Sequence, residues 1–199
     1  MKTMKLKLSD FGLKEGINEV IGITFGTSSA DLNLNAAPLG LMVKDDSGIE
    51  AEVRLYPNNT NHTRENFEKS CELWVNVIHD PVLFVICAFD DPGKEWYESF
   101  DPPILKGALT VCRFSGKLEK GSFAKLRLEY GKVIRSQIRA VNRGFNLLIE
   151  ALIYATRLHL NPSYASRILE LGRIIEKCGG KREKEALLLL KEYIRDKLP

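Results

Sequence analysis

The feature that most constrains the fold of this chain is a change in the spacing of its apolar residues near residue 134. Before that point, apolar residues tend to alternate with polar ones, as in strands with one buried face. Over residues 138–153 they recur every three or four positions, as on one face of a helix. Strands followed by helices predict an α+β fold, with a β core at residues 1–133 and a helical appendage packed on it at residues 134–199.

The first 133 residues consist of short β-branched or alternating runs separated by turn residues. The runs that predict strands are residues 19–25, 32–43, 49–56, 73–78, 108–114 and 124–130. A short helix is predicted at residues 64–70, because Thr63 is a good N-cap and Glu65 suits the positive end of the helix dipole. Residues 82–89 are apolar enough for a buried strand or helix, and residues 90–103 predict a long surface loop. This set of elements favours a β-barrel or a sandwich.

The last third of the chain has the period of helices, interrupted by a proline and by a pair of glycines. The predicted helices run from about residue 134 to Pro162, over residues 163–178 and over residues 181–198. Arg135, Arg139 and Arg143 recur every four residues, so we expect them to share one face of the first helix. Such a stripe is usually a solvated face, although it also suits an anion or a nucleic acid.

Charge is distributed unevenly along the chain. Residues 1–133 hold 16 Lys and Arg against 19 Asp and Glu, and residues 134–199 hold 13 against 7, so balances of −3 and +6 add to the net charge of +3. A balance of +6 is modest, and no strand combines aromatic and basic residues as RNA-binding sheets do. We therefore expect no nucleic-acid partner, and a nucleic-acid-binding barrel is the least favoured function.

The length of 199 residues, 44% of them hydrophobic, is ample for a core that needs no disulfide or metal. No apolar run approaches the roughly 18 residues of a spanning helix. The lysine-containing N-terminus lacks the apolar region of a secretion signal. The four cysteines are widely spaced, so we expect thiols rather than disulfides. These features predict a cytoplasmic protein with no membrane partner.

Two segments are candidate binding sites. The polar loop at residues 58–66 joins a strand to a helix N-terminus, where N–H groups, hydroxyls and amides suit a phosphate. Spacing alone favours the ordinary explanation, in which Thr63 caps the helix and the asparagines form turns. Residues 33–40 place two alanines, a proline and a glycine within a strand pattern, which lets a flat ligand or another backbone approach closely. An irregular edge strand is again the commoner meaning.

The sequence contains no motif of nucleophilic or metal-dependent catalysis. GxSxG, HExxH and Walker sequences are missing, and the three histidines lie in unrelated contexts. No Cys or His pair has the spacing of zinc ligands, so no metal site is expected.

Taken in order, these segments resemble the FMN-binding split-barrel proteins, a superfamily that includes flavin reductase-like and pyridoxamine phosphate oxidase-like proteins. Residues 33–40, with their Asn-Ala-Ala-Pro core, look like the strand that lies along the flavin. Thr63-Arg-Glu-Asn66 followed by Glu72-Leu-Trp-Val-Asn76 is similar to the helix and strand motif T-x-x-N … F-V-V-N. Residues 15–19, 54–56 and 150–157 also resemble one particular branch of this superfamily, which is mostly archaeal and functionally uncharacterised.

The resemblance implies a Greek-key-like split barrel that binds FMN. Such proteins hold the FMN phosphate with hydroxyl, amide and basic side chains, which Thr63 and Asn66 match directly. It leaves open which of residues 58–61 also reaches the phosphate. The implied cofactor-binding residues are Asn35, Ala36, Ala37, Pro38, Leu39, Gly40, Arg54, Tyr56, Thr60, Asn61, Thr63 and Asn66.

The resemblance also implies a homodimer with each flavin near the subunit interface. If the helices contribute to the site, the candidates are Asn142, Glu150 and Arg157. The main functional hypothesis is an FMN-dependent oxidoreductase, in which the flavin performs the electron chemistry. The alternative is a non-catalytic module that binds flavin or another phosphorylated ligand, and the sequence indicates no substrate for either.

Overall fold

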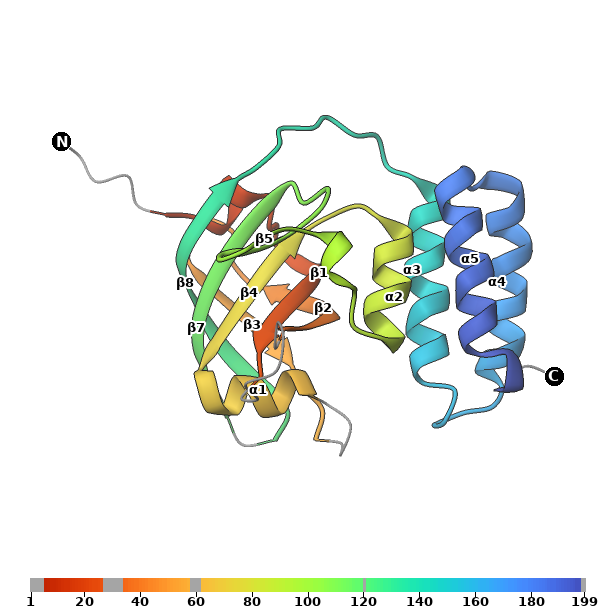
Figure 1. Cartoon of the computed structure of the whole chain (residues 1–199), viewed down its shortest axis with the longest axis horizontal. Helices are drawn as coiled ribbons and strands as arrows, with labels where there is room; N and C mark the ends of the chain where they lie inside the picture. Colours follow the sequence, from red (N-terminus) through yellow and green to blue (C-terminus); the bar gives the residue numbers. More distant parts are fainter. Residues whose placement is uncertain (1–5, 27–33, 58–61, 120, 198–199) are drawn as a thin grey trace. The chain divides into compact units, whose positions relative to one another are not determined.

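The computed structural model describes residues 6–26, 34–57, 62–119 and 121–197 of the chain (Figure 1). The chain divides into two compact units, made of residues 1–79 with 91–137 and of residues 80–90 with 138–199. The first unit is a β-barrel and the second consists of helices. No helix in the described ranges is long and apolar enough to cross a membrane.

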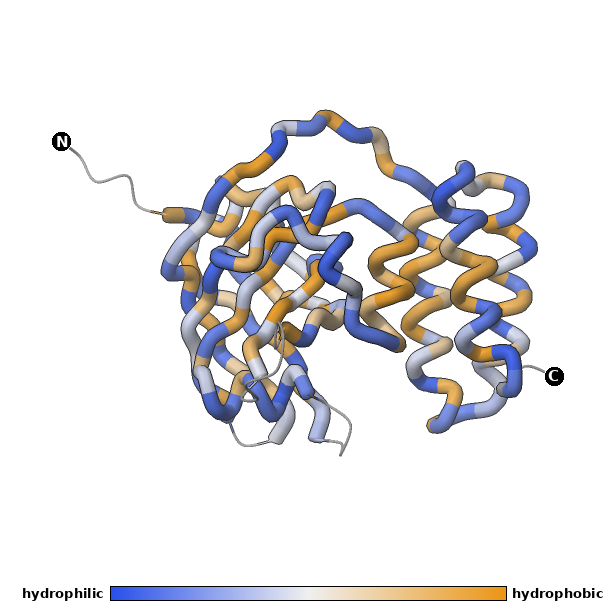
Figure 2. Tube along the Cα trace, in the orientation of Figure 1, coloured by the Kyte–Doolittle hydropathy of each residue, from blue (hydrophilic) through white to orange (hydrophobic). Residues whose placement is uncertain are grey.

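The barrel is closed by six antiparallel strands in the order β1-β2-β3-β8-β7-β4. The strands are β1 (Gly16–Phe25), β2 (Leu34–Val43), β3 (Glu50–Arg54), β4 (Glu72–Val77), β7 (Thr110–Leu118) and β8 (Phe123–Val133). Buried and more exposed residues alternate along β3 and most of β8, as the sequence predicted, whereas residues 20–24 of β1 and 73–76 of β4 are buried in succession. Figure 2 shows hydrophobic and hydrophilic residues in both units of the chain. The predicted fold class, an α+β barrel followed by helices, is therefore confirmed.

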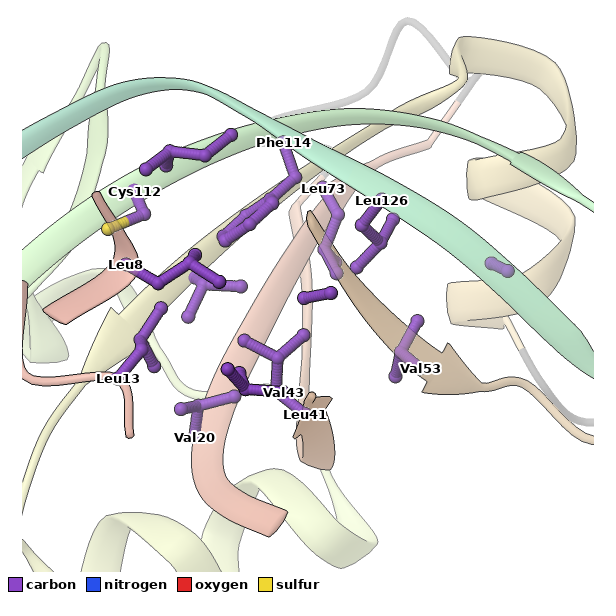
Figure 3. Packing of buried hydrophobic residues seen from close by; sticks show 14 of the residues in the cluster. Leu8, Leu13, Val20, Leu41, Val43, Val53, Leu73, Cys112, Phe114 and Leu126 are labelled. Atoms are coloured by element: carbon purple, nitrogen blue, oxygen red, sulfur yellow. The ribbon is translucent and has the colours of Figure 1, made fainter. Parts of the chain in front are cut away.

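The inside of the barrel is filled by apolar side chains that point inward from every strand. Leu41, Val53, Leu73, Phe114 and Leu126 are each at most 3% exposed, and they lie together in Figure 3. The 3₁₀ helix η1 (Leu8–Phe11) adds buried side chains to the same cluster. The described part of the barrel interior is thus a packed apolar core.

Strand β2 is paired very differently along its two edges. It pairs with β1 over its whole length, from Val43 opposite Gly16 to Leu34 opposite Phe25. With β3 it forms only two pairs, Leu41 with Val53 and Met42 with Glu52. Among the described residues, the other edge of residues 34–40 therefore pairs with no strand.

Residues 90–103, predicted as a long surface loop, contain regular structure, so that prediction is wrong in part. This segment and the residues after it form η2 (Lys94–Trp96) and a hairpin of β5 (Tyr97–Phe100) and β6 (Pro103–Leu105). The fully buried Asn76 of β4 holds the hairpin, because its amide donates to the Pro103 carbonyl at 3.1 Å and accepts from the Leu105 N–H at 2.9 Å. The Asn76 side chain thus satisfies backbone groups of β6 that would otherwise need a strand partner. Such a long-range bond could not be predicted from composition.

The second unit contains α2 (Pro81–Phe89), α3 (Arg143–Thr156), α4 (Tyr164–Cys178), α5 (Lys181–Tyr193) and η3 (Arg195–Lys197). Helix α2 precedes two barrel strands in the sequence, yet it packs against α3 and α5. Phe84 lies edge-on to Phe145, and Phe89 stacks on Tyr193 with ring centroids 4.9 Å apart. The sequence predicted either a buried strand or a buried helix at residues 82–89. The structure shows a helix, which belongs to the second unit. The packing of this unit on the barrel stays a prediction.

The first of the helices predicted in the last third begins later than expected. Residues 134–142 have no regular structure, and α3 starts at Arg143 because the Asn142 side chain accepts from the Phe145 N–H at 3.0 Å. Ile138 and Val141, predicted on the apolar face, are 103% and 88% exposed. The predicted helical stripe of Arg135, Arg139 and Arg143 is thus wrong, since two of these arginines precede the helix.

Candidate functional site

Helix α1 (His62–Ser70) places two of the predicted residues on one buried face. Thr63 and Asn66 are three positions apart and are 4% and 8% exposed. Phe67, 1% exposed, anchors the helix in the barrel core. The helix ends at Ser70. The next residue, Cys71, donates its N–H to the Phe67 carbonyl at 2.8 Å, and its φ of 56° turns the chain into β4.

The face of α1 meets the ends of β1 and β2. The Thr63 hydroxyl donates to the Asn35 amide oxygen at 2.7 Å, and the Asn66 amide donates to the Thr24 hydroxyl at 3.3 Å. Thr24 is fully buried. The structure therefore brings together three predicted residues, Asn35, Thr63 and Asn66, and adds Thr24, which sequence spacing did not indicate.

The loop that follows α2 contributes a carboxylate that was not predicted. Oδ1 of Asp91 accepts from the Asn35 amide and from the Ala36 backbone N–H, both at 3.1 Å. Asp91 lies more than 50 residues from β2 in sequence, so no local pattern relates the two. We call Thr24, Asn35, Thr63, Asn66 and Asp91 the polar cluster.

The unpaired edge of β2 lies beside this cluster. Because Ala36 turns its N–H away from β1, every second residue along the strand does the same, so Pro38 and Gly40 also turn their backbone groups to the unpaired edge. Ala37 and Leu39 turn theirs toward β1, opposite Gly22 and Val20. The first set can offer backbone groups to a ligand, although the Ala36 N–H is already bonded to Asp91 and Pro38 offers a carbonyl alone.

Neighbouring side chains lie close to the two glycines of this region. A Cβ on Gly40 would lie 3.1 Å from Cγ2 of Ile17, and one on Gly22 of β1 would lie 2.3 Å from Cδ1 of Leu39, so a larger residue at either position would require these side chains to shift. Ala36 is 1% exposed. Several side chains along residues 36–40 are therefore small, which allows a flat ligand to approach the backbone closely.

The predicted basic residue Arg54 lies at the end of β3, where it is exposed. Its guanidinium lies 4.5 Å from the ring centroid of Tyr56 and 5.3 Å from that of Phe123. Arg64 of α1, which was not predicted, donates to the Leu55 and Gly121 carbonyls at 2.9 and 3.2 Å, tying the helix to the barrel. Thr60 and Asn61 lie outside the described residues.

The three candidates from the helical segment belong to the second unit. Asn142 caps α3 and donates to the carboxylate of Glu183 at 2.9 Å, which is 5% exposed and also accepts from the Gly180 N–H. Glu150 and Arg157 are exposed at the middle and the end of α3. The contacts of Asn142 are therefore those of a helix cap.

A groove of about 1000 Å³ lies elsewhere on the barrel, along β3, β7 and β8. None of the polar cluster lines it. Its lining holds four basic and four acidic side chains, and two ion pairs form among them, Lys44 with Glu52 at 2.6 Å and Lys125 with Glu119 at 2.8 Å. The hydrogen bond to Glu119 raises the pKa of Lys125. Charges that neutralise one another leave no evident preference for a charged ligand. In the part of the chain that the structure describes, no group of three His, Cys, Asp or Glu side chains could hold a metal ion.

Two models of a family described as proteins of unknown function, DUF447, match the chain. The N-terminal domain model matches residues 18–139, and the C-terminal model matches residues 142–192. The two matches meet close to the start of α3 at Arg143.

Solved structures give a similar result. The crystal structure of an FMN-bound protein of the same family from Methanosarcina mazei is 33% identical, has a TM-score of 0.79, and aligns over 94% of this chain and 99% of that chain. A flavin reductase domain protein of Arthrobacter is 12% identical with a TM-score of 0.48, over 61% of this chain and 80% of that one. An FMN-binding protein of Thermus thermophilus is 12% identical with a TM-score of 0.43, over 62% and 73%. The last two similarities are low.

The Methanosarcina match and the two family models agree along nearly the whole chain, so the family predicted from residues 33–40 and from the T-x-x-N motif is confirmed: this chain belongs to the DUF447 family.

Proposed function

We propose that this protein is an FMN-binding flavoprotein. The observation that carries the proposal is the alignment of 94% of this chain with an FMN-bound member of its own family, at 33% identity and a TM-score of 0.79. That alignment includes the barrel and the helices together, so it compares whole chains and not a shared fragment. A flavin site common to both proteins is the simplest function that such an alignment supports.

The residues near the unpaired edge of β2 fit an FMN molecule. The isoalloxazine ring is flat and carries hydrogen-bonding groups on one edge, which suits a thin strand with backbone groups at Ala36, Pro38 and Gly40. The ribityl chain and the phosphate need several polar partners, and the buried hydroxyls and amides of the polar cluster are such partners. The proposed cofactor-binding residues remain Asn35, Ala36, Ala37, Pro38, Leu39, Gly40, Arg54, Tyr56, Thr60, Asn61, Thr63 and Asn66.

We further propose that the protein is an oxidoreductase. FMN, when bound, supplies the electron chemistry, and this chain supplies binding, orientation and tuning. Steady-state oxidation of NADH and NADPH with added FMN tests this step. Turnover with either nicotinamide supports an enzyme, whereas tight FMN binding without turnover and without photoreduction of the flavin supports the alternative, a non-catalytic flavin-binding module.

A homodimer with the flavin near its interface is also part of the proposal. The unpaired edge of residues 34–40 and the neighbouring Ile17, 69% exposed, support it, because sheet edges and exposed apolar side chains are commonly covered by a second subunit. A cytoplasmic location is supported by the four cysteines, none of which forms a disulfide.

Titration of FMN fluorescence against the purified protein tests the cofactor. We expect quenching by the wild type, and an affinity lower by about 1–3 kcal/mol in Thr63→Ala, which removes a hydroxyl of the polar cluster. The matched control is Thr156→Ala, which removes a hydroxyl that donates to the Ile153 carbonyl in α3. A wild-type protein that neither quenches FMN nor releases it on denaturation contradicts the proposal.

A further inference from the structure

We propose that Glu19 of β1 sets the reduction potential of the bound flavin. Its carboxylate lies over the outer face of β2 at Gly40, beside the place proposed for the flavin ring, and its negative charge disfavours the anionic reduced form of that ring. The inference rests on the proposed FMN function. It adds to that site a residue that is not among the predicted cofactor-binding residues.

The two faces of β2 carry different side chains. Leu41 and Val43 point into the barrel core, where Figure 3 shows them, so alternation places Ala36, Pro38 and Gly40 on the outer face. No side chain at these three positions is larger than a proline ring. Ala36 is 1% exposed, whereas Pro38 and Gly40 are half-buried. A flat group on this face therefore has its room at Pro38 and Gly40.

Glu19 belongs to the same outer face. It pairs with Gly40 in the register of β1 and β2, and the next residue, Val20, faces the core. A Cβ added to Gly40 would lie 3.6 Å from Oε1 of Glu19, which is ordinary van der Waals contact. The carboxylate thus reaches across from β1 to the space above Gly40, which is open because Gly40 has no side chain.

Two other carboxylates near β2 are placed differently. Glu52 of β3 forms an ion pair with Lys44 at 2.6 Å. Asp91 accepts from the N–H of Ala36, at the buried end of the outer face, and is itself exposed to water. Glu19 is half-buried, so water screens its charge less than that of Asp91. Glu19 is therefore the carboxylate placed to act on a ring at Pro38 and Gly40.

A negative charge at this place acts differently on the two oxidation states of FMN. The oxidised ring is neutral, and uptake of two electrons from a reductant and one proton from water leaves one negative charge on the ring. Repulsion between two like charges within about 10 Å in a half-buried setting should weaken binding of the reduced form about 10-fold relative to the oxidised form. For a two-electron couple, a factor of about 10 lowers the potential by about 30 mV.

The test measures the reduction potential of FMN bound to the full chain, by equilibrium with a reference dye during reduction by dithionite. Fluorescence quenching gives the affinity for oxidised FMN. We expect Glu19→Gln to raise the potential by about 30 mV with little change in the affinity for oxidised FMN. Glu19→Asp, which keeps the charge, should stay near the potential of the wild type. The matched control is Glu129→Gln, which removes an exposed carboxylate of β8 and should leave the potential unchanged.

Three results would overturn the inference. An unchanged or lower potential in Glu19→Gln is the first, and an equal rise in Glu129→Gln is the second, since net charge would then explain the effect. The third is an equal loss of affinity for both forms of FMN, which would mean that Glu19 only holds β1 and β2 in place. If Glu19→Gln fails to fold, Glu19→Met, which is uncharged and of similar length, replaces it. A wild type that binds no FMN instead refutes the proposed function itself.

Discussion

The barrel interior and the three buried residues of the polar cluster, Thr24, Thr63 and Asn66, are held together by different forces. Phe114 and Leu73 inside the barrel are fully buried among apolar neighbours, and each contributes by filling space. Thr24, Thr63 and Asn66 are 0%, 4% and 8% exposed, and each is held by a hydrogen bond to a particular partner. The difference teaches that burial alone does not identify a site. Buried groups with directional bonds can bind a ligand, whereas buried apolar groups mainly stabilise the fold.

The largest loss of stability is expected from a substitution at Phe114, in the barrel interior. Phe114→Ala leaves a cavity in the barrel and should lower the free energy of unfolding by about 3–5 kcal/mol. Phe123→Ala is the matched control, since Phe123 is 39% exposed and its removal should cost less than about 1 kcal/mol. Urea unfolding followed by circular dichroism measures both. Equal losses would mean that the interior packing does not dominate the stability of the barrel.

A mixed effect is expected at Asn66, because it belongs to the polar cluster and is buried. Asn66→Ala leaves the fully buried Thr24 hydroxyl without this donor, so we expect unfolding free energy to fall by about 1–3 kcal/mol. FMN affinity should fall as well. In contrast, Phe114→Ala should bind FMN normally at temperatures at which that variant is folded. Ser70→Ala, which removes an exposed hydroxyl at the end of the same helix, is the control. Normal FMN affinity in Asn66→Ala would remove it from the binding residues.

The contrast between apolar packing and directional hydrogen bonds also explains why the barrel strands could be predicted from the sequence more completely than the candidate site. The barrel strands follow from alternation, because the inward positions of each strand must be apolar wherever the strand lies. Asn35, Thr63 and Asn66 were found through the resemblance to a motif. Asp91 could not be found, since the hydrogen bonds that link it to Asn35 and Ala36 join residues more than 50 positions apart.

The helical unit shows the other limit of sequence reasoning. Apolar spacing placed Ile138 and Val141 on a helix face, but a helix begins where its first N–H groups are satisfied, and the Asn142 cap does this only from residue 143. Helix α2 was ambiguous because an apolar run of nine residues suits a buried strand and a buried helix equally. Its N-cap, Asp80, accepts from Val82 and Leu83 and decides the matter locally.

Alkaline pH provides a smaller test of the interior. Burial raises the pKa of the Cys112 thiol from 9.0 to about 12, so the folded protein keeps a proton that the unfolded chain releases above pH 9.0. The unfolded state then binds fewer protons, and stability falls as the pH rises from 9.0 toward 12. Near pH 10 this single thiol should lower the unfolding free energy by about 1.4 kcal/mol relative to pH 8. Cys112→Ala should lose less stability over this interval than the wild type by that amount, whereas Cys71→Ala, at an exposed position, should lose as much as the wild type. Equal slopes in all three proteins would mean that the Cys112 thiol ionises as easily in the folded barrel as in water.

The smallest effect should appear in the helical unit, at Asn142. Asn142→Ala removes the cap of α3 and one partner of the buried Glu183, while Glu183 keeps its bond from the Gly180 N–H. We expect a loss of about 1 kcal/mol of stability and no change in FMN affinity. Asn146→Ala, at an exposed position of the same helix, is the control. Because the printed bonds of Asn142 are to residues of its own unit, a fall in FMN affinity in Asn142→Ala and not in Asn146→Ala would show that the helices contribute to flavin binding.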